Sequence, residues 1–495
     1  MHTDFDRCYR AVQSKDARFD GWFVTAVLTT KIYCRPSCPV RPPYAKNMRF
    51  YPTAAAAKRA GFRACKRCRP DASPGSPEWH VRGDVVARTM RLIADGTVDR
   101  DGVTGLASRV GYTVRQLERL MQAEVGATPL ALARAQRTQM ARVLIETTQM
   151  PISDVAFAAG FASIRQFNDT VRAVCDLTPT MLRSRARTRL DGDDAVGTGV
   201  MSLRLPVRAP FAFEGLFGHL AASAVPGVEE VRDGAYRRTL RLPHGTGIVS
   251  LTPHPDHVRC RLVLEDFRDL STATARCRRL LDLDADPEAV VDALSADEQL
   301  ASLITKAPGQ RIPRTVDEHE LAIRVVLGQQ VSLAAARTHA GRIARAYGDR
   351  VDDPDGGLTH VFPSVHQLSE IDPQHLAFPK ARQRSLAALV TALADGTVRL
   401  DAGCDWNVAR EQLLALPGIG GWTAEMIAMR GLGDPDAFPA TDLGVRVAAQ
   451  QLGLPDAPRL LTERSSSWRP WRSYATQHLW TALDHAVNQW PPKET

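Results

Sequence analysis

The chain has 495 residues, of which 44% are hydrophobic, 24% charged and 6% aromatic. This length and apolar content predict several domains with cores of their own, and they exclude a mainly disordered chain. No apolar run is long enough to cross a membrane and the first residues lack the apolar core of a signal peptide, so we expect a cytoplasmic protein.

The net charge of +8 is distributed unevenly along the chain. Residues 1–80 carry 15 Lys and Arg against 6 Asp and Glu, and residues 81–190 carry 16 against 10. The remaining residues carry 32 against 39. A basic region confined to one part of a chain is typical of segments that bind the phosphates of nucleic acids, the alternative being a surface that serves only solubility.

Four of the nine cysteines are grouped as C-x3-C, 26 intervening residues and C-x2-C: Cys34, Cys38, Cys65 and Cys68. Two close pairs of thiolates separated by a loop are typical of a tetrahedral zinc site. An odd number of cysteines in a cytoplasmic chain disfavours a disulfide framework. We therefore expect the scattered cysteines to be ordinary core or surface residues: Cys8, Cys175, Cys260, Cys277 and Cys404.

The segments FDGWFVTAVLTTKIYCRPSCPVRPP and GFRACKRCRPD resemble the amino-terminal domain of the Ada family of methylation-response proteins, over residues 4–71. That resemblance implies one zinc ion held by the four grouped cysteines, with irreversible transfer of a methyl group from a DNA methylphosphotriester to Cys34. Arg41 matches a position that contacts phosphate in the family. The alternative is a zinc site that is purely structural.

Residues 102–129 and 151–179 form an internal near-repeat. Each copy has a short apolar helix, an Ala-x3-Gly step and an amphipathic helix, a pattern typical of a helix-turn-helix. We expect the second helices at residues 114–121 and 163–171, joined by a long helix over residues 130–147. The Thr-Pro pairs at 128–129 and 178–179 are expected to start the helices that follow them.

The repeat resembles the paired helix-turn-helix domain of the AraC family and implies that the two second helices read DNA. Side chains that contact only phosphate are the alternative for each position. The candidates to reach base edges are Arg115, Gln116, Arg119, Arg165, Gln166 and Asn168.

Short apolar runs over residues 203–270 predict antiparallel strands, and residues from about 285 onward predict helices. The motif LPGIGGWTAEMIAMRGLG at 416–433 follows an amphipathic helix at 407–415 and predicts a helix-hairpin-helix. Its glycines Gly418, Gly420 and Gly421 allow main-chain N–H groups to approach a DNA phosphate. The segment FPATDLG then places Asp442 shortly after the hairpin.

Hairpin and downstream aspartate together resemble the helix-hairpin-helix DNA glycosylases, and residues 203–490 resemble the AlkA type, which acts on 3-methyladenine. The resemblance implies that Asp442 is the catalytic carboxylate and that Trp422 and Trp480 belong to the pocket for the flipped base. Met426 replaces a pocket aromatic. In RVVLGQQVSLAAA, expected to be a helix over residues 324–336, Gln330 replaces the apolar wedge that fills the gap left by the base.

Several sequence features limit the chemistry. Trp422 stands where bifunctional glycosylase/lyases carry a lysine, and the only lysines after residue 310 are Lys380 and Lys493, so we expect a monofunctional enzyme. The cysteine spacing of an iron–sulfur cluster is missing. The resemblance to the glycosylases allows a monovalent cation at the hairpin. The Pro-Cys-His-Arg motif of the methyltransferase domain of Ada is missing, so that domain is not expected in this sequence.

Together these patterns predict a multidomain α+β protein made of a zinc module, an all-α paired helix-turn-helix domain, an antiparallel β subdomain and an all-α glycosylase domain. The expected ranges are 1–78, 82–188, 203–285 and 286–495, with a linker at 189–202. We expect a monomer that binds double-stranded DNA at alkylated purines, methylphosphotriesters and promoters, with RNA polymerase as a further partner. The alternative is a methylation-responsive transcription activator whose glycosylase domain is vestigial.

Overall fold

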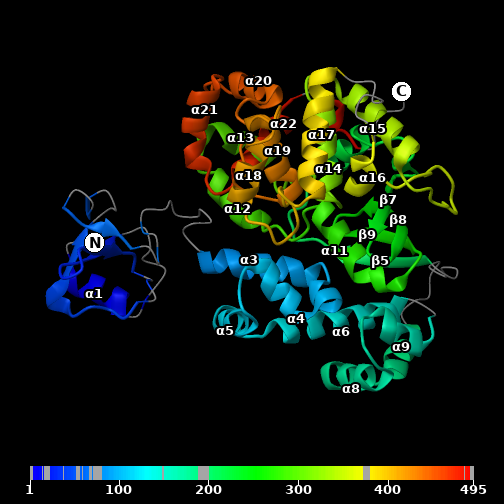
Figure 1. The fold of residues 1–495 in the computed structure, drawn as a ribbon, viewed down its shortest axis with the longest axis horizontal. Helices are drawn as coiled ribbons and strands as arrows, with labels where there is room; N and C mark the ends of the chain where they lie inside the picture. The colour runs from blue at the N-terminus through cyan, green and yellow to red at the C-terminus, as the bar shows by residue number, and fades with distance from the viewer. Residues whose placement is uncertain are drawn as a thin grey trace. The chain divides into compact units, whose positions relative to one another are not determined.

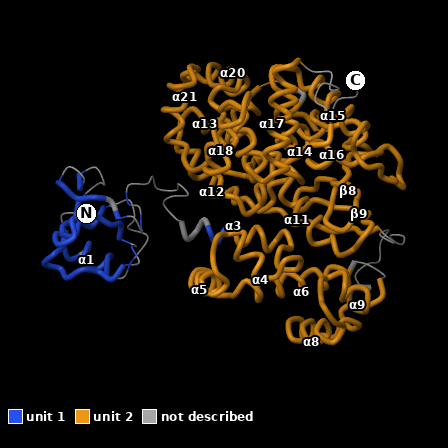
Figure 2. Tube along the Cα trace, viewed as in Figure 1, with its two compact units in different colours: residues 1–87 blue, residues 88–495 orange. Residues whose placement is uncertain are grey.

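The computed structural model describes residues 4–490 apart from 14, 16–22, 37, 39, 52–55, 58–59, 66–67, 69, 71–80, 148–149, 188–199, 372–378 and 484. It divides into two compact units, residues 1–87 and 88–495, which are described separately (Figure 2). No helix in the described part of the chain is both long and apolar enough to cross a membrane.

The first unit is built on a four-stranded sheet in the order β3-β1-β2-β4. Helix α1 buries Cys8 and Val12 beside Phe23 and Met48. The bounds are α1 Phe5–Gln13, β1 Val24–Val27, β2 Ile32–Cys34, η2 Ala45–Asn47, β3 Met48–Tyr51 and β4 Arg63–Ala64.

The helices from α3 to α9, called here the reader domain, confirm the predicted repeat. Ala107 and Ala156 are buried, and Gly111 and Gly160 turn the chain with φ of 77° and 82°. The Thr128 and Thr178 hydroxyls accept N–H groups in the first turns of α6 and α9. The bounds are α3 Val81–Ala94, α4 Thr97–Val110, α5 Val114–Glu124, α6 Pro129–Thr147, α7 Ile152–Ala158, α8 Ile164–Cys175 and α9 Pro179–Arg187.

An antiparallel sheet in the order β5-β9-β8-β7-β6 follows. Its first strand begins at Val200, inside the range 189–202 expected to be a linker, and residues 189–199 of that range lie outside the described residues. Short apolar runs over residues 203–270 were expected to form strands, and within that range residues 214–222 form a helix that was not predicted. The bounds are β5 Val200–Pro206, α10 Glu214–Ala222, β6 Glu229–Arg232, β7 Ala235–Leu242, β8 Gly245–Pro253 and β9 His257–Leu264.

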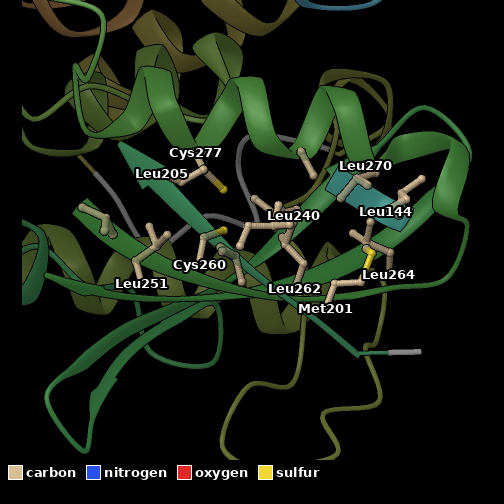
Figure 3. Close-up of a cluster of buried hydrophobic side chains, with 14 of the residues drawn as sticks. Leu144, Met201, Leu205, Leu240, Leu251, Cys260, Leu262, Leu264, Leu270 and Cys277 are labelled. Carbon is tan, nitrogen blue, oxygen red and sulfur yellow. The ribbon is translucent and has the colours of Figure 1, made fainter. Parts of the chain in front are cut away.

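The reader domain and this sheet share one hydrophobic core. Leu144 of α6 is fully buried in the same cluster as Leu262 of β9 and Leu270 of α11 (Leu270–Leu280) (Figure 3). The Gln136 amide donates to the Ser271 hydroxyl at 2.9 Å. Figure 1 shows the helices of the reader domain beside the strands of the sheet, so the two form one packed body.

We expect Leu144→Ala to lower the free energy of unfolding by about 2–5 kcal/mol, because it leaves a cavity in this shared core. Chemical denaturation of the full chain measures the change. Leu414→Ala is the matched control, since Leu414 is 50% exposed and should change stability by less than about 0.5 kcal/mol. Equal effects of the two substitutions would contradict the shared core.

The rest of the chain is helical and has two further cores. The bounds are η3 Phe267–Asp269, α12 Pro287–Leu294, α13 Glu298–Lys306, α14 Glu318–Leu327, α15 Leu333–Tyr347, α16 Val365–Ser369, α17 Lys380–Ala394, α18 Trp406–Leu414, α19 Gly421–Met426, η5 Ile427–Leu432, α20 Leu443–Gln451, α21 Pro458–Arg464, η6 Ser465–Trp468, α22 Arg472–Thr481 and η7 Ala486–Asn488.

The prediction of one helix over residues 324–336 is wrong. Helix α14 ends at Leu327 and α15 begins at Leu333. The Ser332 hydroxyl accepts the N–H of Ala335 and starts α15, while Gln330 adopts the left-handed conformation with φ of 55°. Apolar periodicity continues through this turn, and the local cap interrupts the helix.

Candidate active sites and DNA-binding surfaces

Asp442 lies at the N-terminus of α20, where its carboxylate has three hydrogen-bond donors. Its Oδ1 accepts the N–H of Val445 at 3.0 Å and the indole N–H of Trp480 at 2.9 Å. Its Oδ2 accepts the indole N–H of Trp422 at 2.9 Å. The helix cap and two rings from distant segments therefore fix the orientation of this carboxylate.

A second set of polar contacts holds the segment that leads to Asp442. Glu425 accepts the N–H of Phe438 at 2.8 Å. Arg410 pairs with Glu425 and Asp434, and these interactions raise the pKa of Arg410 although burial opposes them. Residues 434–442 are thereby tied to α18 and α19, the two helices of the hairpin.

The predicted hairpin is formed by α18, the turn at residues 415–420 and α19. Gly418 has φ of 77°, and a Cβ atom there would collide with the Ser385 hydroxyl. Gly420 and Gly421 are exposed, and a Cβ atom added to either would meet nothing within 4 Å. The start of α19 has no side-chain cap. Uncapped N–H groups at an exposed helix start favour an anion such as phosphate.

We expect Gly418→Ala to destabilise the hairpin by about 1–3 kcal/mol, because alanine is strained at this φ and Ser385 leaves no room for it. Gly421→Ala is the matched comparison, since its site is open and stability should be preserved. The affinity for duplex DNA should fall in both variants, because an added methyl group keeps a DNA phosphate away from the main-chain N–H groups of the turn. Thermal unfolding and a salt titration of duplex binding measure the two effects, and a Gly421→Ala variant with full affinity would contradict phosphate binding at this turn.

Gln330 is exposed beside the hairpin. The Gln329 amide donates to the Gly418 oxygen at 3.1 Å and to the Thr423 hydroxyl at 2.9 Å. Arg382 donates to the main-chain oxygen of Gln329. The Gln329 bonds join the 328–332 turn to the hairpin, and the Arg382 bond joins it to α17.

A cavity of about 290 Å³ lies next to Trp422, one of the two rings that bond to Asp442. Trp422 and Met426 line it, whereas Trp480 is not one of its lining residues. Glu229, Arg238 and Arg324 form ion pairs along its wall. Burial alone would raise the pKa of Glu229, but the two guanidinium groups lower it to about 2.

His219 on α10 also lines the cavity, and sequence reasoning missed it because the segment lies in a range interpreted as short strands and turns. The apolar spacing of Leu216, Phe217 and Leu220 around it is the signal for a helix.

The four grouped cysteines come together in the first unit. Residues 33 and 64 pair in the parallel strands β2 and β4, which places Cys34 and Cys65 side by side. The four sulfur atoms lie within 4.8 Å of one another. A tetrahedral zinc with Zn–S bonds of about 2.3 Å separates its sulfurs by about 3.8 Å, so the four thiols fit one zinc ion.

Exposure distinguishes the four cysteines. Cys34 is half-buried, whereas Cys38, Cys65 and Cys68 are buried. Arg41 is exposed in the same unit. The scattered cysteines are also free thiols, four of them buried and Cys175 half-buried.

The second helices of the repeat carry the predicted reading side chains. Arg115, Arg119, Arg165 and Asn168 are exposed, and Gln166 is half-buried. Gln116 lies in a capping box in which its side-chain oxygen accepts the N–H of Thr113 at 3.0 Å. Any contact of Gln116 with a base is therefore expected to come from its side-chain amide N–H groups, because the side-chain oxygen is engaged in the capping box.

Family models match three segments of the chain. The metal binding domain of Ada matches residues 7–71, a helix-turn-helix domain matches residues 106–185, and the AlkA N-terminal domain matches residues 202–317.

Similar proteins are known over the whole chain and over its second half. A protein of Mycobacterium tuberculosis named "Probable bifunctional transcriptional activator/DNA repair enzyme AlkA" is 75% identical, covering 100% of this chain and 99% of its own. DNA-3-methyladenine glycosylase 2 of Escherichia coli is 33% identical over 58% of this chain and 97% of its own. The solved 3-methyladenine DNA-glycosylase from Archaeoglobus fulgidus is 20% identical, with a TM-score of 0.48, over 57% of this chain and 97% of its own.

Proposed function

Because this chain belongs to the family of bifunctional transcriptional activators and DNA repair enzymes, we propose that it releases alkylated purines from DNA at Asp442 and accepts methyl groups from DNA at Cys34. It is a DNA-binding repair protein with a glycosylase, an Ada-type zinc domain and a helix-turn-helix domain. The observation that carries the first activity is the Asp442 carboxylate held by two indole N–H groups beside a cavity lined by Trp422.

Base release follows from the charge on the substrate. Alkylation of a ring nitrogen makes the purine cationic, so it leaves as a neutral base when the glycosidic bond breaks. Positive charge then develops on the sugar, where the Asp442 carboxylate stabilises it and orients a water for addition at the same carbon. The water supplies the new hydroxyl group, and its second proton passes to solvent.

The surrounding residues have supporting roles in this proposal. The flipped base enters the cavity against Trp422, whose ring attracts a cation, and Met426 packs beside it. Trp480 orients Asp442. Gly418, Gly420 and Gly421 bring the hairpin main chain to a phosphate, and Gln330 occupies the space that the base leaves. A monovalent cation at the hairpin and the absence of lyase chemistry stay predictions.

Methyl transfer to Cys34 uses the same principle of a good leaving group. The Cys34 sulfur attacks the methyl carbon of the phosphotriester, a C–S bond forms, and the C–O bond breaks to leave an ordinary phosphodiester. Zinc held by Cys34, Cys38, Cys65 and Cys68 supplies a deprotonated thiol at neutral pH. The greater exposure of Cys34 supports its selection among the four.

Methylation of Cys34 also changes the charge of the zinc site. Four thiolates and one zinc ion carry a formal charge of −2, and one thioether reduces this to −1. Removing one negative charge about 8 Å from a phosphate is worth about 2 kcal/mol at an effective dielectric near 20. Methylated protein should therefore bind duplex DNA more than tenfold more tightly, as Arg41 and the reader side chains engage it.

The reader domain accounts for promoter recognition in this proposal, through Arg115, Gln116, Arg119, Arg165 and Gln166. Contact with RNA polymerase and the exact domain limits (1–78, 82–188, 203–285 and 286–495) stay predictions. The test of the function is release of free methylpurines from methylated duplex by the full chain. An inactive but folded chain that still binds promoter DNA would instead favour an activator with a vestigial glycosylase.

A further inference from the structure

The cavity beside Trp422 contains a histidine that no proposed step uses. The cavity volume of about 290 Å³ is close to the roughly 300 Å³ at the lower end of sites for drug-sized molecules. A single flipped base is smaller than such molecules, so the cavity is large enough for one base. Selectivity among bases requires polar groups in such a wall, because apolar contact alone separates similar ligands poorly.

His219 reaches this wall from α10, whose other face is anchored in the core. Leu216, Phe217 and Leu220 are buried and fix the helix against the sheet. The Nε2 atom of His219 is buried and has no hydrogen-bond partner among the described residues. A buried polar atom without a partner is unfavourable and calls for a ligand that satisfies it.

Most other polar side chains of the wall are already hydrogen-bonded. Ser223 donates to the main-chain oxygen of His219 at 2.7 Å, and Arg430 donates to the main-chain oxygen of Pro313 at 2.8 Å. Arg324 pairs with Glu229 and Glu320. The His219 Nε2 thus lacks a partner, whereas these groups already have theirs.

The imidazole is uncharged in this environment. Burial, followed by the Arg430 and Arg324 guanidinium groups and by His485, holds the pKa of His219 well below its usual range. A neutral imidazole offers one donor and one acceptor and does not repel a cationic base. The neutral imidazole of His219 can therefore contact the same cationic bases that the face of Trp422 attracts.

We propose that His219 is a specificity-determining residue for base release, because its ring nitrogen hydrogen-bonds the polar edge of the base that enters the cavity beside Trp422. The inference rests on the proposed glycosylase function. Adenine-type bases present an amino group at C6 and guanine-type bases a carbonyl group. A single ring nitrogen in a fixed position therefore forms hydrogen bonds of unequal strength with the two types of base.

The test compares release of 3-methyladenine and 7-methylguanine from one methylated duplex by the full chain and by His219→Phe. The ratio of the two release rates should change at least fivefold, with the affinity for undamaged duplex unchanged. His219→Leu, which is smaller than phenylalanine and close to histidine in volume, gives the same readout if the phenylalanine variant does not fold. His254→Phe is the control, since the His254 Nε2 is also buried without a partner but lies beyond β8, outside the cavity walls.

An unchanged ratio in an active His219 variant would overturn the specificity role, and so would an equal change in the His254 variant. If the unsubstituted chain released neither base, the proposed function would fail and this inference with it. If the unsubstituted chain released both bases and the ratio of the two rates were unchanged in the His219 variant, only the specificity role of His219 would fail and the proposed function would stand.

Discussion

Replacing Asp442 with asparagine is expected to lower the rate of base release by about 10³-fold or more, because the carboxylate charge that stabilises the transition state is lost. Asparagine keeps the shape of the side chain, and its oxygen can still accept the N–H of Val445 that starts α20. The indole N–H of Trp422 loses its acceptor, so a loss of about 1–3 kcal/mol of stability is expected.

The measurement is release of methylpurines from methylated duplex under single-turnover conditions, with duplex affinity and thermal unfolding recorded on the same preparations. Asp456→Asn is the matched control, because Asp456 is an exposed aspartate of the same domain. Duplex affinity should be preserved in both variants. Base release by Asp442→Asn at the rate of the unsubstituted chain would refute the assignment of the catalytic carboxylate.

Replacing Cys34 with alanine is expected to abolish methyl uptake from methylphosphotriester DNA and to weaken zinc binding, since three thiolates then remain at a four-ligand site. Intact mass after exposure to such DNA measures the uptake, and metal analysis measures the zinc content. Cys175→Ala is the control, because Cys175 is half-buried in α8 and outside the cysteine cluster. It should accept one methyl group as the unsubstituted protein does.

Peptide mapping of the unsubstituted protein keeps the prediction testable even if Cys34→Ala does not fold. The added methyl group should be found on Cys34. A methyl group on one of the three buried cysteines would identify a different nucleophile, and no methyl group on any of them would favour a zinc site that is purely structural.

Predictions from the sequence succeeded where a function depends on residues close together in the chain. The Ala-x3-Gly steps and the Thr-Pro pairs located the helices of the reader domain to within a few residues, because each turn and cap is made by its own side chains. The glycines of residues 416–433 predicted the hairpin for the same reason. Cysteine spacing predicted the four-thiol cluster.

Local patterns misled in two places. The turn at residues 328–332 interrupts a helix that apolar periodicity predicts, because Ser332 caps a new helix and Gln329 bonds to the hairpin. Residues 214–222 were expected within a run of strands, and this error concealed His219. In the first segment a local cap and a bond to the hairpin outweigh the apolar periodicity. In the second, the spacing of Leu216, Phe217 and Leu220 was a local signal for a helix that the prediction did not use.

The sequence by itself therefore determined the grouping of the four cysteines, the repeated reader helices and the hairpin with its downstream aspartate, because motif spacing encodes each of them. The family followed from the resemblance of whole segments. Only the tertiary structure decided that Trp422 and Trp480 both donate to Asp442, that the reader domain shares a core with the sheet, and that His219 lines the cavity. These features join segments far apart in the chain. Their geometry depends on how buried surfaces pack against one another, which no local spacing specifies.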